Sequence, residues 1–119
     1  MTVNRLGRPH RRGEFVAPVS VLIDAIAHRD RWTIARLATG ELLDEALGGT
    51  YNDAFGRSGQ DAESVRLDGA PVVMVDDGMA VVIGAATGTN LSEPVPVCAL
   101  LVESRTPGRG WLVAALTLD

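Results

Sequence analysis

The chain contains 119 residues, which is enough for one domain with a single hydrophobic core. Hydrophobic residues make up 46% of it and charged residues 22%, a composition that excludes an intrinsically disordered chain. No apolar run reaches the roughly 18 residues that cross a bilayer. Aromatic residues, at 4%, leave few platforms on which nucleic-acid bases could stack. We therefore predict neither a membrane nor a nucleic-acid partner.

The first fourteen residues predict a flexible basic leader. The first twelve contain four arginines and no acidic residue, and they show no hydrophobic periodicity. Such a tail can reach for nucleic acid or an anionic surface, but it is more often a solvated terminus, and we adopt that interpretation. The segment also loosely matches a secretory signal peptide, but Glu14, Pro18 and Asp24 interrupt the match. We predict a cytoplasmic protein with a leader at 1–14 and one domain at 15–119.

Two helices are predicted next. The first begins near Ala17, with Pro18 in its first turn, and its apolar residues recur at helical spacing: Phe15, Val19, Leu22, Ile23 and Ile26. Asp30 then predicts the N-cap of a second helix, because its carboxylate can accept the free N–H groups of the first turn. Residues 41–47 predict a third short turn or strand. Residues 50–64 predict a long irregular loop, a feature that often carries function.

The last third of the chain predicts an antiparallel sheet. Its apolar runs, separated by turn residues, are 72–75, 79–89, 95–104 and 111–118. The connections are too short for the crossovers that join parallel strands, which favours a meander. Asp77-Gly78 is a two-residue hairpin signal. A short strand over 64–67, followed by a turn at Asp68-Gly69, precedes the meander. The glycines at 84 and 88 favour bends or close backbone approaches within a strand.

Both faces of the predicted sheet are apolar. An antiparallel sheet with one face in water alternates apolar and polar residues. The last strand instead places Trp111 and Val113 on one side and Leu112 and Leu116 on the other. Two helices can cover one face, and nothing else in the chain can cover the second. We therefore predict a homodimer packed through the sheet, with the candidate interface residues Trp111, Val113, Leu100 and Val102.

Two segments carry a resemblance to a known superfamily. They are residues 25–37, AIAHRDRWTIARL, and residues 110–116, GWLVAAL. They resemble the turn between the first two helices, with the second helix, and the last strand of the nuclear-transport-factor-2-like superfamily, which includes ketosteroid isomerases and polyketide cyclases. The resemblance implies an α+β, cystatin-like cone. In such a cone, two N-terminal helices pack on a strongly curved antiparallel sheet and leave a pocket at the open end.

The resemblance does not extend to the acid–base residues of the isomerases. In those enzymes a tyrosine on the first helix and an aspartate on a late strand hold an enolate oxygen, and a second aspartate after the second helix moves the proton. The register of the resemblance places Leu22 at the tyrosine, Ala99 or Leu100 at the oxygen-binding aspartate, and Ala46 near the base. Hydrocarbon side chains cannot donate the hydrogen bond that stabilises an oxyanion.

The implied pocket needs a few polar groups on an apolar wall. The candidates for lining it are Tyr51, Phe55, Trp32 and Leu22, and the candidate proton-transfer carboxylates are Asp44, Glu45 and Asp53. The plainer interpretation is that these acids are solvated, that Tyr51 packs against the helices and that Trp32 lies in the core. No metal or cofactor is predicted, because no ligands recur at coordination spacing.

Three functions remain open at this point. The sequence favours a dimeric small-molecule-binding or scaffold domain that lacks the isomerase acid–base residues and that could hold a small apolar ligand. The first alternative is an isomerase-, cyclase- or hydrolase-like enzyme for a small cyclic or polyketide-like substrate, with Asp44, Glu45 or Asp53 as base and Tyr51 as hydrogen-bond donor. The second alternative is an interaction module whose sheet face binds a different protein.

Overall fold

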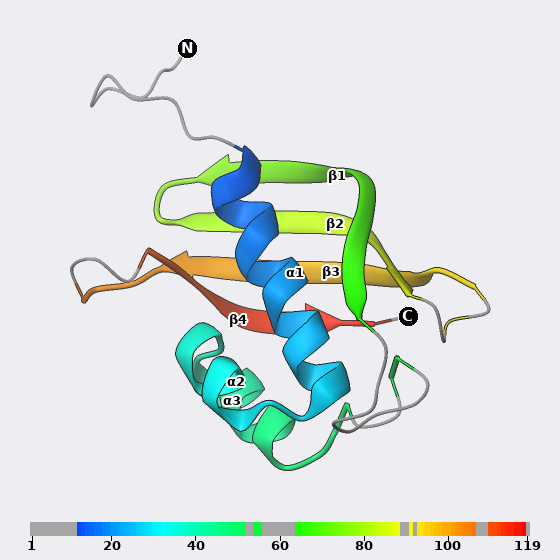
Figure 1. Ribbon diagram of the computed structural model, residues 1–119. Coiled ribbons are helices and arrows are strands. Elements are labelled where there is room, and N and C mark those ends of the chain that lie inside the picture. Colours follow the sequence, from blue (N-terminus) through cyan, green and yellow to red (C-terminus); the bar gives the residue numbers. More distant parts are fainter. Residues whose placement is uncertain are drawn as a thin grey trace.

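Four antiparallel strands form one sheet, and helices pack along one side and one edge of it (Figure 1). The computed structural model describes residues 12–51, 54–55, 64–88, 91, 93–106 and 110–118. The helices are α1 (Arg12–His28), α2 (Arg31–Leu37) and α3 (Gly40–Leu47), and the strands are β1 (Val65–Asp76), β2 (Met79–Gly88), β3 (Val95–Glu103) and β4 (Trp111–Thr117). The strands pair in chain order, which confirms the predicted meander and the α+β class.

β1 is a single bent strand where the sequence predicts a short strand, a turn and a second strand. Its register with β2 shifts between Asp68 and Val72, so that residues 69–71 lie opposite Gly84. A Cβ atom on Gly84 would come within 3.3 Å of the Cβ of Pro71, so the close approach that the glycines predicted is present here. The expected turn at Asp68-Gly69 is therefore an irregularity within one strand, and it bends β1 without ending its pairing.

A bulge in β4 decides which of its side chains face the helices. The pairing with β3 passes over Ala114, which is an extra residue in β4. The alternation of faces therefore shifts by one residue, and Trp111, Val113 and Leu116 are all buried, with exposed fractions of 8%, 0% and 8%. The sequence prediction placed Leu116 on the side opposite Trp111, which is wrong for this reason.

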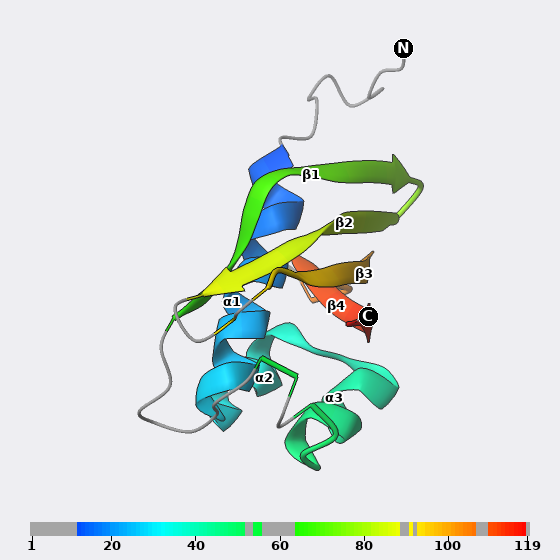
Figure 2. The same ribbon diagram turned by 90° about the vertical axis from the view of Figure 1, so that its right-hand side faces the viewer.

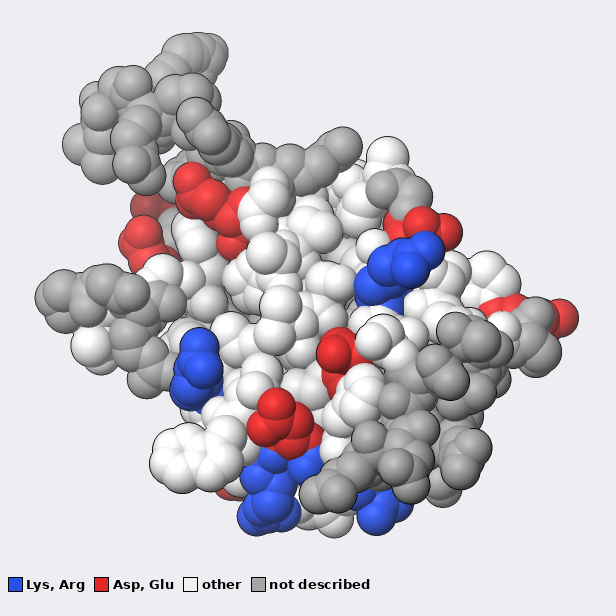
Figure 3. All heavy atoms as spheres, in the orientation of Figure 1, with Lys and Arg blue, Asp and Glu red and all other residues white. Residues whose placement is uncertain are grey.

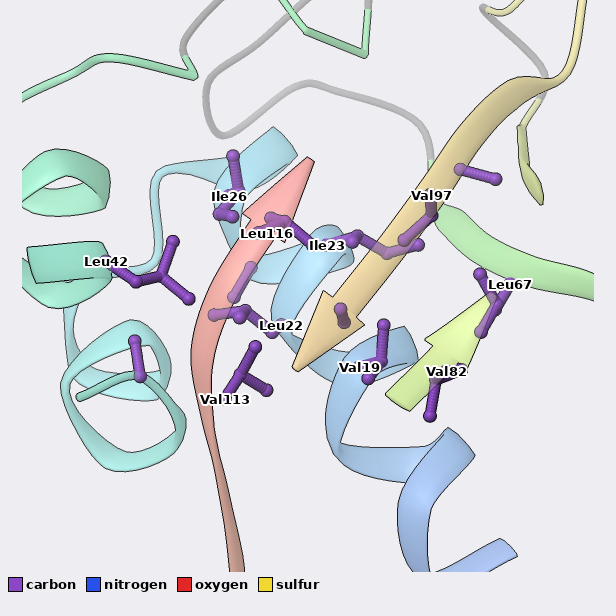
Figure 4. Close-up of a cluster of buried hydrophobic side chains, with 14 of the residues drawn as sticks. Val19, Leu22, Ile23, Ile26, Leu42, Leu67, Val82, Val97, Val113 and Leu116 are labelled. Atoms are coloured by element: carbon purple, nitrogen blue, oxygen red, sulfur yellow. The ribbon is translucent and has the colours of Figure 1, made fainter. Parts of the chain in front are cut away.

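α1 supplies the helix side of the core. Figure 4 shows Val19, Leu22 and Ile23 in the layer of side chains between α1 and the sheet. The largest fully buried side chains of α1 are those three and Phe15. The helix begins at Arg12 rather than near Ala17, so Pro18 lies in its interior, where it has no N–H to donate to the helical ladder. The ring of Phe15 packs edge-on against Trp111, with a centroid distance of 4.9 Å. The free energy gained by burying Phe15 offsets the hydrogen bond that the helix loses at Pro18.

α2 begins as the sequence predicts. The Asp30 carboxylate accepts a hydrogen bond from the backbone N–H of Thr33 at 3.2 Å and another from the Thr33 hydroxyl at 2.7 Å. These hydrogen bonds, with that of the hydroxyl the largest cause, lower the pKa of Asp30, because they favour its charged form. The predicted N-cap is confirmed.

α3 occupies the residues predicted as a short turn or strand. Leu42 and Ala46, one helical turn apart, are buried, and Leu43 and Leu47 pack beside them, which is the spacing of a helical face. The domain therefore has three helices rather than two. Just before α3, the N–H of Thr39 donates to the carbonyl of Val113 at 2.9 Å, which ties this region to the β4 edge of the sheet.

Two polar side chains of α1 bind the backbone of β1. Asp24 Oδ1 accepts the N–H of Val65 at 2.8 Å, and Ser20 Oγ accepts the N–H of Leu67 at 3.1 Å. These N–H groups lie in the first half of an edge strand, where they would otherwise need water or another strand. The two hydrogen bonds fix the angle at which β1 crosses α1.

Replacing Asp24 with alanine is expected to lower the free energy of unfolding by about 1–3 kcal/mol, because the Val65 N–H loses its partner. Asp24→Asn is the matched control, since its amide oxygen can still accept this hydrogen bond, and it is expected to lose less. Urea unfolding followed by circular dichroism measures both. An Asp24→Ala protein as stable as the wild type would show that this hydrogen bond contributes nothing.

Candidate functional site

The side of the sheet away from α1 carries three rows of side chains that run across all four strands. Cross-strand partners lie on the same face of an antiparallel sheet, so the register gives the rows directly. They are Val72, Ile83, Cys98 and Thr117; Met74, Val81, Leu100 and Ala115; and Asp76, Met79, Val102 and Leu112. We call these residues the outer sheet face. Only Asp76, Thr117 and the thiol of Cys98 make it polar.

No described helix covers the outer sheet face beside β1, β2 and β3. Figure 2 shows α1 on one side of these strands and no helix on the other. Val72 and Met74 are each 53% exposed, Met79 is 46% exposed and Ile83 is 42% exposed. Large apolar side chains clustered on neighbouring strands form the kind of patch that marks an interaction surface.

The predicted interface residues divide between the two faces. Leu100 and Val102 are half-buried and belong to the outer sheet face. Trp111 and Val113 lie on the other face, buried among the side chains of α1. The surface that the fold leaves for a partner therefore includes Leu100 and Val102 but neither Trp111 nor Val113.

The predicted pocket residues do not converge on one cavity. Leu22 and Phe55 are 0% and 2% exposed and belong to the hydrophobic core. Trp32 is 83% exposed on α2, so the plainer interpretation of it as a core residue is wrong. Asp53 lies outside the described residues. Within the part of the chain that the structure describes, these side chains form no shared wall for a ligand.

Tyr51 connects α3 to β4. Its hydroxyl lies 3.3 Å from a carboxylate oxygen of Glu45 and 3.4 Å from the carbonyl oxygen of Leu116, and its single proton can be donated to either. Desolvation, followed by the negative charge and the hydrogen bond of Glu45, raises the pKa of Tyr51. Asp44 and Glu45 are both exposed. This arrangement suits a structural tether better than a proton-transfer site.

The raised pKa of Tyr51 can be measured cleanly, because this is the only tyrosine in the chain. Its phenolate absorbance is expected to titrate above the usual value of about 10, and Glu45→Gln is expected to bring the pKa part of the way back. Since the folded-state pKa exceeds the unfolded-state one, stability is expected to fall as the pH rises past about 10, and less so in Tyr51→Phe. Titration at the ordinary value would contradict the assigned contacts.

A shallow hollow of about 250 Å³ lies where the end of α1 meets α2 and α3. Its floor contains Ile26 and Ile34, and its rim contains Arg29, Arg31 and residues 47–49. Arg31 Nη1 donates to the carbonyl of Leu47 at 3.1 Å across the hollow. Figure 3 shows arginine side chains gathered at the lower edge of the helix side, over this part of the fold. The sequence analysis did not identify this hollow.

Among the described residues, no group of three histidine, cysteine, aspartate or glutamate side chains is placed to hold a metal ion. None of the helices that these residues form is long and apolar enough to cross a membrane.

A comparison with solved structures finds a similar fold in a nuclear transport factor 2 (NTF2-like) superfamily protein from Salmonella enterica serovar Typhimurium strain LT2. The TM-score is 0.60, and the match covers 89% of this chain and 87% of that chain. This chain has the nuclear-transport-factor-2-like fold. The sequence identity is 13%, so the predicted resemblance is confirmed at the level of the fold. No protein-family model and no curated protein matches the sequence.

In this nuclear-transport-factor-2-like domain, the space between α1 and the sheet is occupied by hydrocarbon side chains. Leu22 and Ala99 are both 0% exposed. In the register of the resemblance, Leu22 stands at the position of the isomerase tyrosine, and Ala99 stands at one of the two possible positions of the oxygen-binding aspartate. No polar or charged residue is buried within the described ranges. The hydroxyl oxygen of Thr87, in a half-buried residue of β2, is a buried polar atom without a hydrogen-bond partner among the described residues.

Proposed function

We propose that this chain is a dimeric scaffold domain in which two copies pack through the outer sheet face. The observation that carries the proposal is the mainly apolar surface across all four strands, with its largest exposed side chains on β1 and β2. Removing apolar area from water is the main favourable term in association. An exposed surface of this kind lowers the solubility of a monomer, and burying it in a dimer lowers the free energy.

The chemistry of the outer sheet face favours a second copy as the partner. Asp76, at one corner, is the only charged residue of the three rows, and Arg66 and Asp68 continue the same side of the sheet beyond the irregularity in β1. The three rows themselves therefore offer little to a partner selected by charge. Two identical copies related by a two-fold axis bring the same patch together, and a patch with its single charge at a corner can do this with little repulsion. The half-buried Leu100 and Val81 lie in the middle row, where a dimer would exclude water most completely.

The described interior supports a scaffold rather than an acid–base enzyme. The core between α1 and the sheet is apolar, and the candidate carboxylates Asp44 and Glu45 lie on the exposed surface of α3. A small apolar ligand of the kind expected from the sequence would need space that these described core residues already fill.

Light scattering after size exclusion, over a range of protein concentrations, tests the proposal. The expected result is the mass of two chains, with dissociation to one chain only on strong dilution. A single-chain mass at every concentration would contradict self-association and would favour a different protein as the partner of the outer sheet face. The variant Val81→Glu changes that face and separates a dimer formed there from one formed elsewhere.

A further inference from the structure

The hollow at the end of α1 lies on a different part of the molecule from the outer sheet face. Ile26, Ile34 and Ala46 are among its lining residues and form an apolar floor, although only 3%, 2% and 8% of their surface is exposed. Arg29 and Arg31 line the same hollow and are exposed. An apolar floor beside cationic side chains suits a molecule that has an apolar body and an anionic group.

The backbone of Arg29 points to a role for its side chain. Its φ of 56° is in the left-handed region, and no other described non-glycine residue has a positive φ. The conformation ends α1, since the N–H of Arg29 donates to Ile26 at 3.2 Å and that of Asp30 donates to Ala25 at 2.8 Å. Glycine usually occupies this position because a Cβ atom disfavours it. A strained arginine in place of glycine is a reason to look for function.

The two guanidinium groups retain unused hydrogen-bonding capacity. Within the described ranges, the side chain of Arg29 has no hydrogen-bond or ion-pair partner. Arg31 donates from Nη1 to Leu47, which leaves its other N–H groups available. The carboxylate of Asp30, between them in the sequence, is held by the N–H and hydroxyl of Thr33.

The charges around the hollow nearly balance before a ligand binds. The C-terminal ends of α1 and α3 meet there, and each helix end carries about half a negative elementary charge, so together they offset one arginine. The carboxylate of Asp30, which stands between the two arginines in the sequence, offsets the second. A carboxylate ligand is therefore recognised by the directed N–H groups of the guanidiniums rather than by an excess of positive charge.

We infer that the hollow binds a small organic carboxylate with an apolar body. Arg29 and Arg31 hold the carboxylate, since a guanidinium pairs with it through two parallel hydrogen bonds. The body rests on Ile26, Ile34 and Ala46. A volume of about 250 Å³ is smaller than the sites of drug-sized molecules, which hold about 300–1,000 Å³. The body is therefore no larger than an aromatic ring or a short branched chain.

Benzoate is the probe, and benzamide, which has a similar shape and no charge, is its control. In amide NMR spectra of the full chain, benzoate is expected to bind saturably in the millimolar range. The resonances expected to shift are those around the hollow, including Ile26, Gly48 and Gly49. Benzamide is expected to leave them unchanged. Equal shifts with the two compounds, or no saturable shift with benzoate, would overturn the assignment.

Arg29→Gly separates binding from folding. Glycine fits the left-handed backbone, so this variant is expected to melt at or above the wild-type temperature while its affinity for benzoate falls about tenfold or more. Arg36→Gln is the control, because it also removes one arginine charge, but from a position in α2 that does not line the hollow. This variant is expected to retain benzoate binding. Undiminished binding in Arg29→Gly, or an equal loss in Arg36→Gln, would overturn the proposal.

Discussion

Replacing Val81 with glutamate is expected to turn the proposed dimer into a monomer. Val81 lies in the middle row of the outer sheet face, between Met74 and Leu100. In the monomer a glutamate there would remain in water, so the fold should survive at a modest cost in strand propensity. In the dimer the two-fold axis would place one unpaired charge from each copy in an apolar contact. An uncompensated buried charge costs about 3–5 kcal/mol, which weakens association by about a hundredfold to a few thousandfold for each charge.

Val21→Glu is the control for this variant. Val21 is 50% exposed on α1, on the helix side of the molecule, and it receives the same change of size and charge. It is expected to keep the mass of two chains in light scattering, while Val81→Glu gives the mass of one. A Val81→Glu protein that remains dimeric would mean that the two copies meet through some surface other than the outer sheet face.

Phe15→Ala is expected to lower the free energy of unfolding by about 3–5 kcal/mol, the usual cost of deleting a large buried aromatic ring. Phe15 is 1% exposed, and its ring meets that of Trp111 at an interplanar angle of 61°. The variant loses the transfer free energy of the ring and leaves a cavity between α1 and β4. Since small domains are stable by only about 5–15 kcal/mol, a large part of the folded population is at risk.

Urea unfolding followed by the fluorescence of Trp111 measures this loss. Trp32, which is 83% exposed, should change little on unfolding and gives a nearly constant background. Val21→Ala removes methyl groups from an exposed site and is expected to change stability by less than about 0.5 kcal/mol. All proteins are compared at one concentration, because dimerisation couples stability to concentration. A loss below about 1 kcal/mol in Phe15→Ala would contradict the packing of α1.

Local signals in the sequence predicted much of the sheet and the start of α2. The turn of Asp77 and Gly78 joins β1 to β2 as expected, with Gly78 at a φ of 77°. Asp30 caps α2 because its short carboxylate needs only a backbone N–H from the first turn of that helix, which Thr33 supplies. These features depend on residues that are close in sequence. That is why composition and spacing were sufficient to predict them.

The failures arose where packing overrides local preference. The sequence predicts a start of α1 near Ala17, with Pro18 in the first turn, but the helix begins at Arg12 and buries Phe15 before the proline. The extra residue at Ala114 leaves no compositional trace, and yet it changes the side of the sheet on which Leu116 lies. A one-residue shift is enough to exchange the two faces of a strand.

The candidate sites were predictable only in part. An uncovered apolar face follows from counting helices against sheet faces. Leu100 and Val102 lie on that face, and their role as interface residues stays a prediction. The hollow was not predictable, because its lining combines the end of α1 with α2 and the end of α3, and only the folded chain brings these together. The left-handed backbone of Arg29 likewise has no signature in the residue itself.

The order of the elements along the chain has a consequence for synthesis. α1 leaves the ribosome before any strand, but its apolar side is covered by strands that begin only at Val65. The connection before α3 waits longer still, because Thr39 donates its hydrogen bond to Val113 in the last strand. We therefore expect the nascent chain to carry an exposed apolar helix until β4 is made. Holding chaperones should bind the growing chain during this interval and release it once the sheet is complete.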